Sequence, residues 1–206
     1  MVDRPLPDGQ QVGFRWGYTA SGYETSLSVF DGFNHLPVVE LIGASAIALE
    51  LPTMRMYGAD TAIPTRWFTL KGEAAYSTTS TASADEYVLY VVQLERQHGE
   101  WQLLGGYAGE IVTKEQAVGR FAPDRGMTRS LIGRASYTID PNRSAAIETA
   151  IRENLDGVYV KAEYSQAHGD HWRATGTIAI IAGREDDFLG QYRRNSHAIL
   201  AVRYSF

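Results

Sequence analysis

The sequence contains no cysteine, which excludes disulfide bonds, thiol catalysis and cysteine-ligated metals. It has no apolar run of about 18 residues, so a helical membrane protein is excluded. An excess of positive charge is also missing, because the formal net charge is -5 and the Lys and Arg residues are scattered. Nucleic-acid binding is therefore a poor hypothesis. The absence of a long apolar run does not exclude membrane-spanning β-strands, because each of these needs only about 9–11 residues.

Motifs for enzyme chemistry are missing as well. There is no phosphate-binding glycine loop and no pair of carboxylates on a helical pattern. Ser196 and His197 are adjacent, so in a strand they point to opposite faces and cannot pair directly. His168 and His171 share a tight turn, and the acidic run 185–187 lies in a polar link; we interpret both as solvated rather than metal-binding. We expect no enzyme activity, no metal and no cofactor.

What the sequence does have is alternation of apolar and polar side chains from Gln10 onward. In the last segment, Leu200, Val202 and Tyr204 alternate with Ala201 and Arg203. A period of two residues indicates β-strands with one apolar and one wet face. Eleven such segments are predicted, at residues 10–20, 23–31, 47–60, 64–78, 86–97, 100–113, 128–140, 144–154, 157–168, 171–184 and 195–206. Residues 144–155 also fit a helix, because Ile147, Ile151 and Leu155 repeat every four residues; the strand is preferred because its neighbours are strands.

The connections between these segments differ in length. Tight turns are predicted at 21–22, 62–64, 98–99, 141–143 and 169–170. Longer polar links are predicted at 32–46, 79–85, 114–127 and 185–194, with a short one near 156–157. Short turns at one rim and longer loops at the other are typical of a transmembrane barrel, where the short turns face the periplasm.

Aromatic residues gather near the predicted short-turn rim. They are Tyr18, Trp67, Trp101, Tyr137 and Trp172. Tryptophan and tyrosine are enriched where a membrane meets water, so we interpret these residues as an interfacial girdle. The alternative is that aromatic residues are simply common near strand ends.

The C-terminal residues 201–206 (AVRYSF) resemble the terminal signature of Gram-negative outer-membrane barrels, which ends in Phe. This resemblance implies that Leu200, Val202, Tyr204 and Phe206 form the signal read by the barrel-assembly machinery. Residues 54–60 (MRMYGAD) and 70–76 (LKGEAAY) also resemble porin-type outer-membrane proteins of proteobacteria. The family resemblance implies a bacterial outer-membrane location, with the lipid bilayer and lipopolysaccharide as partners.

The predicted fold is all-β: an antiparallel transmembrane β-barrel of about 11–12 up-and-down strands over residues 10–206, with residues 1–9 as an N-terminal extension or truncation scar. Residues 1–10 contain no apolar stretch of the signal-peptide type. Counting connections back from a periplasmic Phe206 places Gln10 outside, whereas complete bacterial barrels have both termini in the periplasm. Either the count is wrong by one, at 38–50 or 144–155, or N-terminal strands are missing. The second case predicts an open seam between the strands at 10–20 and 195–206.

The wet face would line the lumen of this barrel. Its predicted members are Arg15, Glu24, Arg55, Lys71, Glu73, Glu110, Arg134, Glu148, Arg152, Lys161, Glu163, Arg173 and Arg203. These residues either line a narrow aqueous path or pair across a packed interior. Basic side chains are in the majority, so an aqueous path would favour anions.

Three functional hypotheses follow. The first is porin-like passive diffusion of small polar solutes, or a structural surface role if the lumen is filled. The second is an outer-membrane barrel enzyme that acts on lipid. The third is a soluble β-barrel that binds a ligand, in which the apolar face points inward; periodicity alone does not distinguish inside from outside. The unequal rims, the aromatic residues and the terminal Phe favour a membrane protein.

Overall fold

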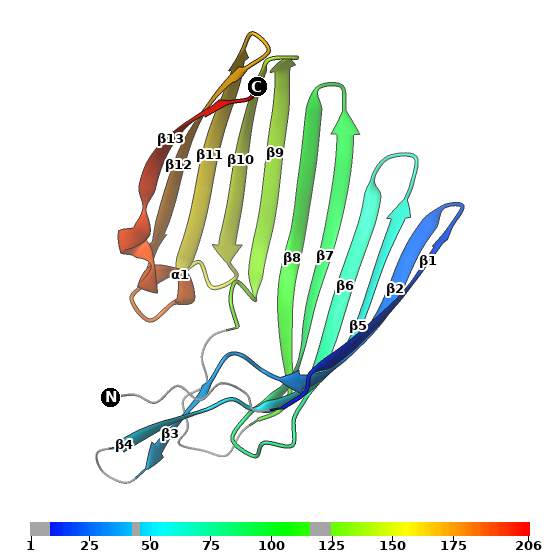
Figure 1. The fold of residues 1–206 in the computed structure, drawn as a ribbon, viewed down its shortest axis with the longest axis vertical. Coiled ribbons are helices and arrows are strands. Elements are labelled where there is room, and N and C mark those ends of the chain that lie inside the picture. Colours follow the sequence, from blue (N-terminus) through cyan, green and yellow to red (C-terminus); the bar gives the residue numbers. More distant parts are fainter. Residues whose placement is uncertain (1–8, 43–45, 116–124) are drawn as a thin grey trace. The chain divides into compact units, whose positions relative to one another are not determined.

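A computed structural model describes residues 9–42, 46–115 and 125–206. Eleven antiparallel strands form one sheet in the order β1-β2-β5-β6-β7-β8-β9-β10-β11-β12-β13 (Figure 1). Their bounds are β1 (Val12–Ala20), β2 (Tyr23–Phe33), β5 (Thr53–Pro64), β6 (Thr69–Thr78), β7 (Glu86–His98), β8 (Trp101–Lys114), β9 (Ser130–Asp140), β10 (Arg143–Arg152), β11 (Gly157–His168), β12 (Trp172–Gly183) and β13 (His197–Tyr204). The predicted fold class, an all-β antiparallel up-and-down sheet of this size, is confirmed.

A separate hairpin lies between β2 and β5. It consists of β3 (Val38–Ile42) and β4 (Ala46–Glu50), which pair only with each other among the described strands. The predicted strand over 47–60 is therefore wrong at its start, because the main ladder begins at Thr53. Pro52 separates the two strands, since proline has no N–H to donate to a ladder. The carbonyl of Pro52 instead accepts a hydrogen bond from the Asn34 N–H, at 2.8 Å.

The turn between β5 and β6 also differs from the prediction. Residues 62–64 still belong to β5, and the turn comprises residues 65–68. Its ends are joined by a hydrogen bond from the Thr65 N–H to the Phe68 carbonyl, at 2.8 Å. The Thr65 hydroxyl accepts from the Phe68 N–H, at 3.1 Å. Threonine hydroxyls stabilise turns by hydrogen bonding to nearby backbone groups. In a sequence, threonine indicates a turn less strongly than proline does, which is why the turn was placed at Pro64.

A strand was predicted over residues 144–154, and the structure has one at residues 143–152, so the helical alternative is wrong. β10 pairs with β9 on one side and with β11 on the other. Two ladders satisfy its backbone groups, which outweighs the helical preference of its Ala and Glu residues. Leu155, the last member of the helical repeat, lies beyond the strand in a turn with φ of 62°.

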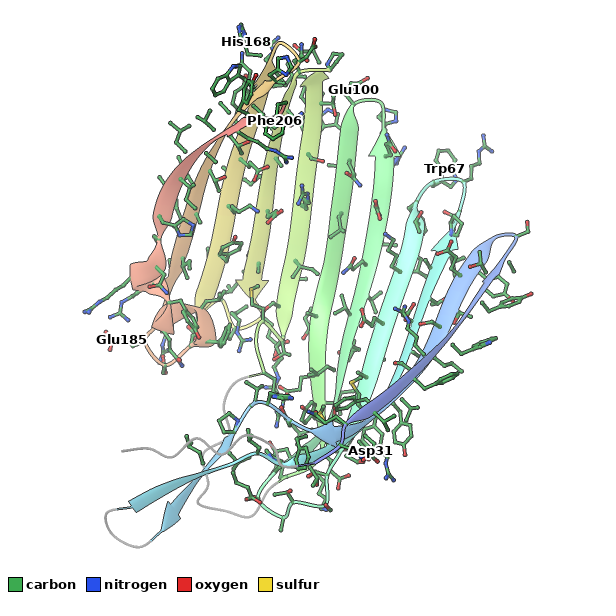
Figure 2. The ribbon with its side chains drawn as sticks, in the orientation of Figure 1. Asp31, Trp67, Glu100, His168, Glu185 and Phe206 are labelled. Carbon is green, nitrogen blue, oxygen red and sulfur yellow. The ribbon has the colours of Figure 1, made fainter. Side chains whose placement is uncertain are left out.

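The chain divides into two compact units. The N-terminal unit comprises residues 1–63, 72–91 and 109–125, and the C-terminal unit comprises residues 64–71, 92–108 and 126–206. Figure 2 places Trp67, Glu100, His168 and Phe206 at one end of the C-terminal unit and Glu185 at the other. The predicted sorting of connections therefore holds in this unit: the turns at 65–68, 99–100, 141–142 and 169–171 share one end, and the long link 184–196 lies at the opposite end.

The link after β12 contains a short helix, α1 (Phe188–Gln191), and a 3-10 turn (Arg193–Asn195). No helix in the described part of the chain is long and apolar enough to cross a membrane. The predicted N-terminal extension falls outside the described residues apart from Gly9, as do residues 116–124 of the predicted link 114–127. β1 and β13 stand at the two ends of the strand order. The predicted seam between them stays a prediction.

Candidate functional site: the charged face of the sheet

The strand register gathers charged residues on one face of the C-terminal unit. Residues directly opposite each other in a ladder share a face. Arg134 lies opposite Glu148, and Glu148 lies opposite Lys161. The same rule assigns to this surface, here called the charged face, the predicted residues Arg134, Glu148, Arg152, Lys161, Glu163, Arg173 and Arg203. Lys71 joins it through Glu95, which also accepts a hydrogen bond from Gln102 of β8.

The opposite face of this unit, here called the apolar face, is made of exposed hydrophobic side chains. Ile178 is 56% exposed, Leu200 78% and Val202 62%. Within the described ladders of β9–β13, the only Lys, Arg, Asp or Glu side chains that this rule brings to the apolar face are Arg143 and its direct partner Asp140, which form an ion pair at the irregular start of β10. A protein surface in water is expected to be polar, and contiguous exposed apolar patches mark a site of interaction.

Ion pairs join neighbouring strands across the charged face. Glu148 accepts from Arg134 and lies 3.0 Å from the Lys161 ammonium. Lys71 pairs with Glu95 in the same way. These side chains are partly exposed, so each pair contributes at most about 1 kcal/mol to stability. Glu95 was not among the predicted residues, because residues 87–94 of its segment are mostly apolar on both faces and alternation does not assign an orientation there.

The charges of the N-terminal unit form their own clusters. Arg15 donates to the hydroxyl of Ser26 and to Asp60, each at 2.9 Å. Glu24 shares this face, because it lies opposite Thr19, two residues along β2 from Ser26. Two further predicted residues belong to this unit: Glu73 is exposed on β6, and Glu110 on β8 accepts a hydrogen bond from Arg125.

Arg125 is a half-buried cation outside the strands. It donates to Asp85 and Glu110, and its guanidinium lies 4.1 Å from the centre of the Tyr87 ring. Burial lowers the pKa of Arg125, but the hydrogen bond to Asp85 and the charge of Glu110 outweigh burial, so the net pKa is raised. Arg125 therefore stays charged while partly covered, and its position was not predicted from the sequence.

Arg55 lies on the wrong face for the role predicted for it. The register pairs it with Asp31, whose face is that of Tyr57, Val29 and Leu27. It therefore does not share a face with Arg15 and Glu24, beside which it was predicted to lie. Arg55 is only two residues past the start of β5, and Asp31 neutralises it through an ion pair of 2.5 Å. A charge at the end of a strand can reach water, so the alternation rule is weakest there.

The link after β12 folds back over the charged face. Asp187 accepts from the Leu189 N–H at 2.9 Å, which caps α1, and from Arg152 Nε at 3.1 Å. The Asp187 side chain is 2% exposed and that of Arg152 is 11% exposed. A Cβ on Gly157, which lies on the charged face, would collide with the Asp187 carboxylate. Arg152 is thus on the predicted face, but it anchors this loop instead of presenting a free cation.

The acidic run of the same loop is fully paired with arginines. Glu185 pairs with Arg193, Asp186 with Arg184, and Asp187 with Arg152. The hydrogen bonds from Arg184 hold the pKa of Asp186 below its usual value. In the described ranges of the chain, no group of three or more His, Cys, Asp or Glu side chains could hold a metal ion.

Two of the five histidines contact backbone carbonyls. His171 Nδ1 lies 2.8 Å from the Ser205 carbonyl, and His197 Nδ1 lies 2.8 Å from the Asn195 carbonyl. Ser196 is hydrogen-bonded to backbone groups of Ile181. Among the residues that the structure describes, no histidine ring is hydrogen-bonded to a serine or threonine hydroxyl.

The predicted aromatic girdle has paired members in the C-terminal unit. Trp101 lies opposite Tyr137 with ring centres 4.7 Å apart, and Trp172 lies opposite Tyr204 at 4.9 Å. Both pairs are on the apolar face, beside the short turns. Trp67 lies in the turn 65–68 and is 61% exposed. In the N-terminal unit, Tyr18 stacks on Trp16 at 6.0 Å. Their role at a membrane surface stays a prediction.

The predicted assembly signal lies on β13 and just after it. Leu200, Val202 and Tyr204 are on the apolar face, and Phe206 follows the strand as a fully exposed side chain. Recognition of these residues by an assembly machinery stays a prediction.

No protein-family model and no curated protein matches the sequence. Solved structures of outer-membrane phospholipases show a distant similarity. The outer membrane phospholipase (OMPLA) dimer with bound calcium from Salmonella typhi shares 8% identity at a TM-score of 0.45, over 94% of this chain and 76% of that chain. Outer membrane phospholipase A from Escherichia coli shares 10% identity at a TM-score of 0.44, over 95% of this chain and 77% of that chain. At these values the similarity assigns no activity to this chain.

Proposed function

We propose that this chain forms an outer-membrane β-barrel whose apolar face contacts lipid and whose charged face lines a water-filled interior, through which small polar solutes diffuse passively. The observation that carries the proposal is the segregation of charge across the sheet of the C-terminal unit. Glu148, Lys161 and Arg173 lie on one face, and Ile178, Leu200 and Val202 lie on the other.

Energetics support lipid contact for the apolar face. Fully burying one large aliphatic side chain contributes about 1.5–3 kcal/mol, so a row of exposed Ile, Leu and Val residues is costly in water. Lipid acyl chains remove this cost, and strands that alternate in this way are the signature of membrane barrels. Tryptophan and tyrosine pairs at the short-turn end fit the level of the lipid headgroups.

The soluble-barrel hypothesis remains the main competitor. It would place Ile178 and Leu200 in a dry core and the ion-paired charges outside. The aromatic pairs at one end and the unequal connections favour the membrane arrangement. Accordingly, we propose the lipid bilayer, lipopolysaccharide and the barrel-assembly machinery as partners, and porin-type proteins as the nearest functional class.

We also propose a passive rather than an enzymatic role. Lipid hydrolysis at a barrel wall would need an activated hydroxyl beside a histidine. The described histidines contact backbone carbonyls or make no hydrogen bond. If the folded protein in detergent releases fatty acid from phospholipid above the blank rate, this part of the proposal is wrong.

Conductance across a planar bilayer tests the passive role. Folded protein should give discrete current steps that grow with salt concentration, with a preference for anions because basic side chains are in the majority on the charged face. Protein boiled before addition is the control. If the protein inserts, as shown by protection from added protease, and yet carries no current, solute diffusion is excluded and a structural surface role replaces it.

A further inference from the structure

Arg173 and Arg203 are an unusual pair on the charged face. They lie directly opposite each other in the β12–β13 ladder. Directly opposed side chains have Cβ atoms about 4.5–5.5 Å apart, and like charges in that position destabilise a sheet. Some other charge or dipole must therefore compensate for the two guanidinium groups.

The other cations of this face already have carboxylate partners. On β9–β13, Arg134 and Lys161 pair with Glu148, and Arg152 pairs with Asp187. Neither Arg173 nor Arg203 has an ion pair with any described carboxylate. On β11 the nearest acidic residue is Glu163, which lies four residues from Ala167, the residue opposite Arg173. Four residues of strand span about 13 Å, beyond the distance over which exposed charges interact strongly in physiological salt. Asp170 lies in the turn three residues before Arg173, and within the described residues it forms no ion pair with either arginine.

A row of hydroxyl groups lies beside the two arginines. Thr138, Ser144, Ser165 and Thr175 are successive direct partners across β9, β10, β11 and β12. Thr175 donates to the Ser165 hydroxyl at 3.2 Å, and Arg173 approaches the same oxygen at 3.4 Å. Ala167, opposite Arg173, has a small side chain without a polar group.

This combination is what an oxyanion requires. Guanidinium groups bind phosphate or carboxylate through two parallel N–H donors, and hydroxyl groups supply further donors. We infer that Arg173, Arg203 and the adjacent hydroxyl row bind a small oxyanion, either inorganic or carried by a phosphorylated or carboxylated solute. The inference deepens the proposed function, on which it rests. An oxyanion site at the short-turn end of the charged face would make the barrel selective for anionic solutes.

Equilibrium dialysis of radiolabelled inorganic phosphate tests this site without requiring conductance. The folded chain would be held in an uncharged maltoside detergent at constant ionic strength. Wild-type protein should bind phosphate saturably. In the double variant Arg173→Gln/Arg203→Gln, affinity should fall at least about tenfold, since each charged hydrogen bond contributes about 1.5–3 kcal/mol.

The matched control is Arg134→Gln/Lys161→Gln, which removes the same charge from the same face at positions paired with Glu148. Its phosphate affinity should stay within about twofold of wild type, because a factor of two is under 0.5 kcal/mol. Heat-modifiable migration on gels verifies that both variants fold. Equal losses in both variants, or no binding by wild type, overturn the site. Binding of phosphatidylglycerol but not of free phosphate also overturns it. Phosphate binding without bilayer current would contradict the proposed diffusion while leaving the site intact.

Discussion

Ile178 and Thr177 are neighbours on β12 whose side chains point to opposite faces of the sheet. Ile178 is exposed on the apolar face, and Thr177 lies directly opposite Glu163 on the charged face. Face, rather than position along the chain, should therefore decide whether a charge is tolerated at either residue.

An arginine scan of these two positions tests that expectation. Ile178→Arg should lower the free energy of unfolding from lipid vesicles by about 2–4 kcal/mol if the residue lies near the bilayer midplane. Thr177→Arg should change it by less than about 1 kcal/mol, because the new guanidinium faces water and Glu163. Tryptophan fluorescence during guanidinium titration measures both. Equal costs would show that the faces are misassigned.

At single residues, sequence reasoning succeeded where strands are long and failed near their ends. The alternation of Lys161 with Ala162, or of Arg173 with Ala174, was enough to assign faces because β11 and β12 pair without irregularity. Arg55 was misassigned because every charged residue was assigned to the wet face, whereas Arg55 lies near the start of β5 on the apolar face, paired with Asp31. Partners such as Asp187 depend on how a loop folds back, which periodicity does not encode.

Among the structural elements, the link 184–196 differs most from its prediction as a solvated polar connection. Its helix α1 packs against β11 and β12, and Asp187 joins it to Arg152 of β10. In a water-filled barrel, a loop held over the charged face would narrow one end of the path. In the proposed barrel, the Arg152–Asp187 contact would hold the loop in that position.

Replacing Asp187 should release this loop. Asp187→Ala removes the cap of α1 and leaves Arg152 buried without its carboxylate; the cap alone contributes about 1 kcal/mol. Trypsin should then cleave after Arg193 and Arg194 on the order of tenfold faster, as expected when local opening becomes easier by about 1.4 kcal/mol. Mass spectrometry of timed digests measures the rate.

Asp186→Ala is the matched control for this experiment. Asp186 lies in the same run but pairs only with the exposed Arg184. Cleavage after Arg193 and Arg194 should therefore proceed at the wild-type rate. Equal acceleration in both variants would mean that Asp187 does not anchor the loop.

For the whole molecule, the fold class and the number of strands in the main sheet could be predicted from the sequence. Each strand carries its own two-residue alternation, and turn residues separate successive strands, so the pattern is local. The β3–β4 hairpin could not be predicted from alternation. It depends on Pro52, which separates β4 from β5, and on the pairing of two segments of only five residues each. Periodicity also does not show whether the apolar face contacts lipid, because the same alternation is found in strands that pack against a dry protein core.

Site-specific lipid quenching tests the lipid-facing assignment most directly. The chain has no cysteine, so Ile178→Cys and Thr177→Cys can each carry one thiol-linked fluorophore without background labelling. In vesicles with brominated acyl chains, the label at 178 should be strongly quenched and the label at 177 should not, while aqueous iodide should quench the label at 177 preferentially. If the bromolipids quench both labels equally, or leave the label at 178 unquenched, the apolar face does not contact lipid and the membrane-barrel account is wrong.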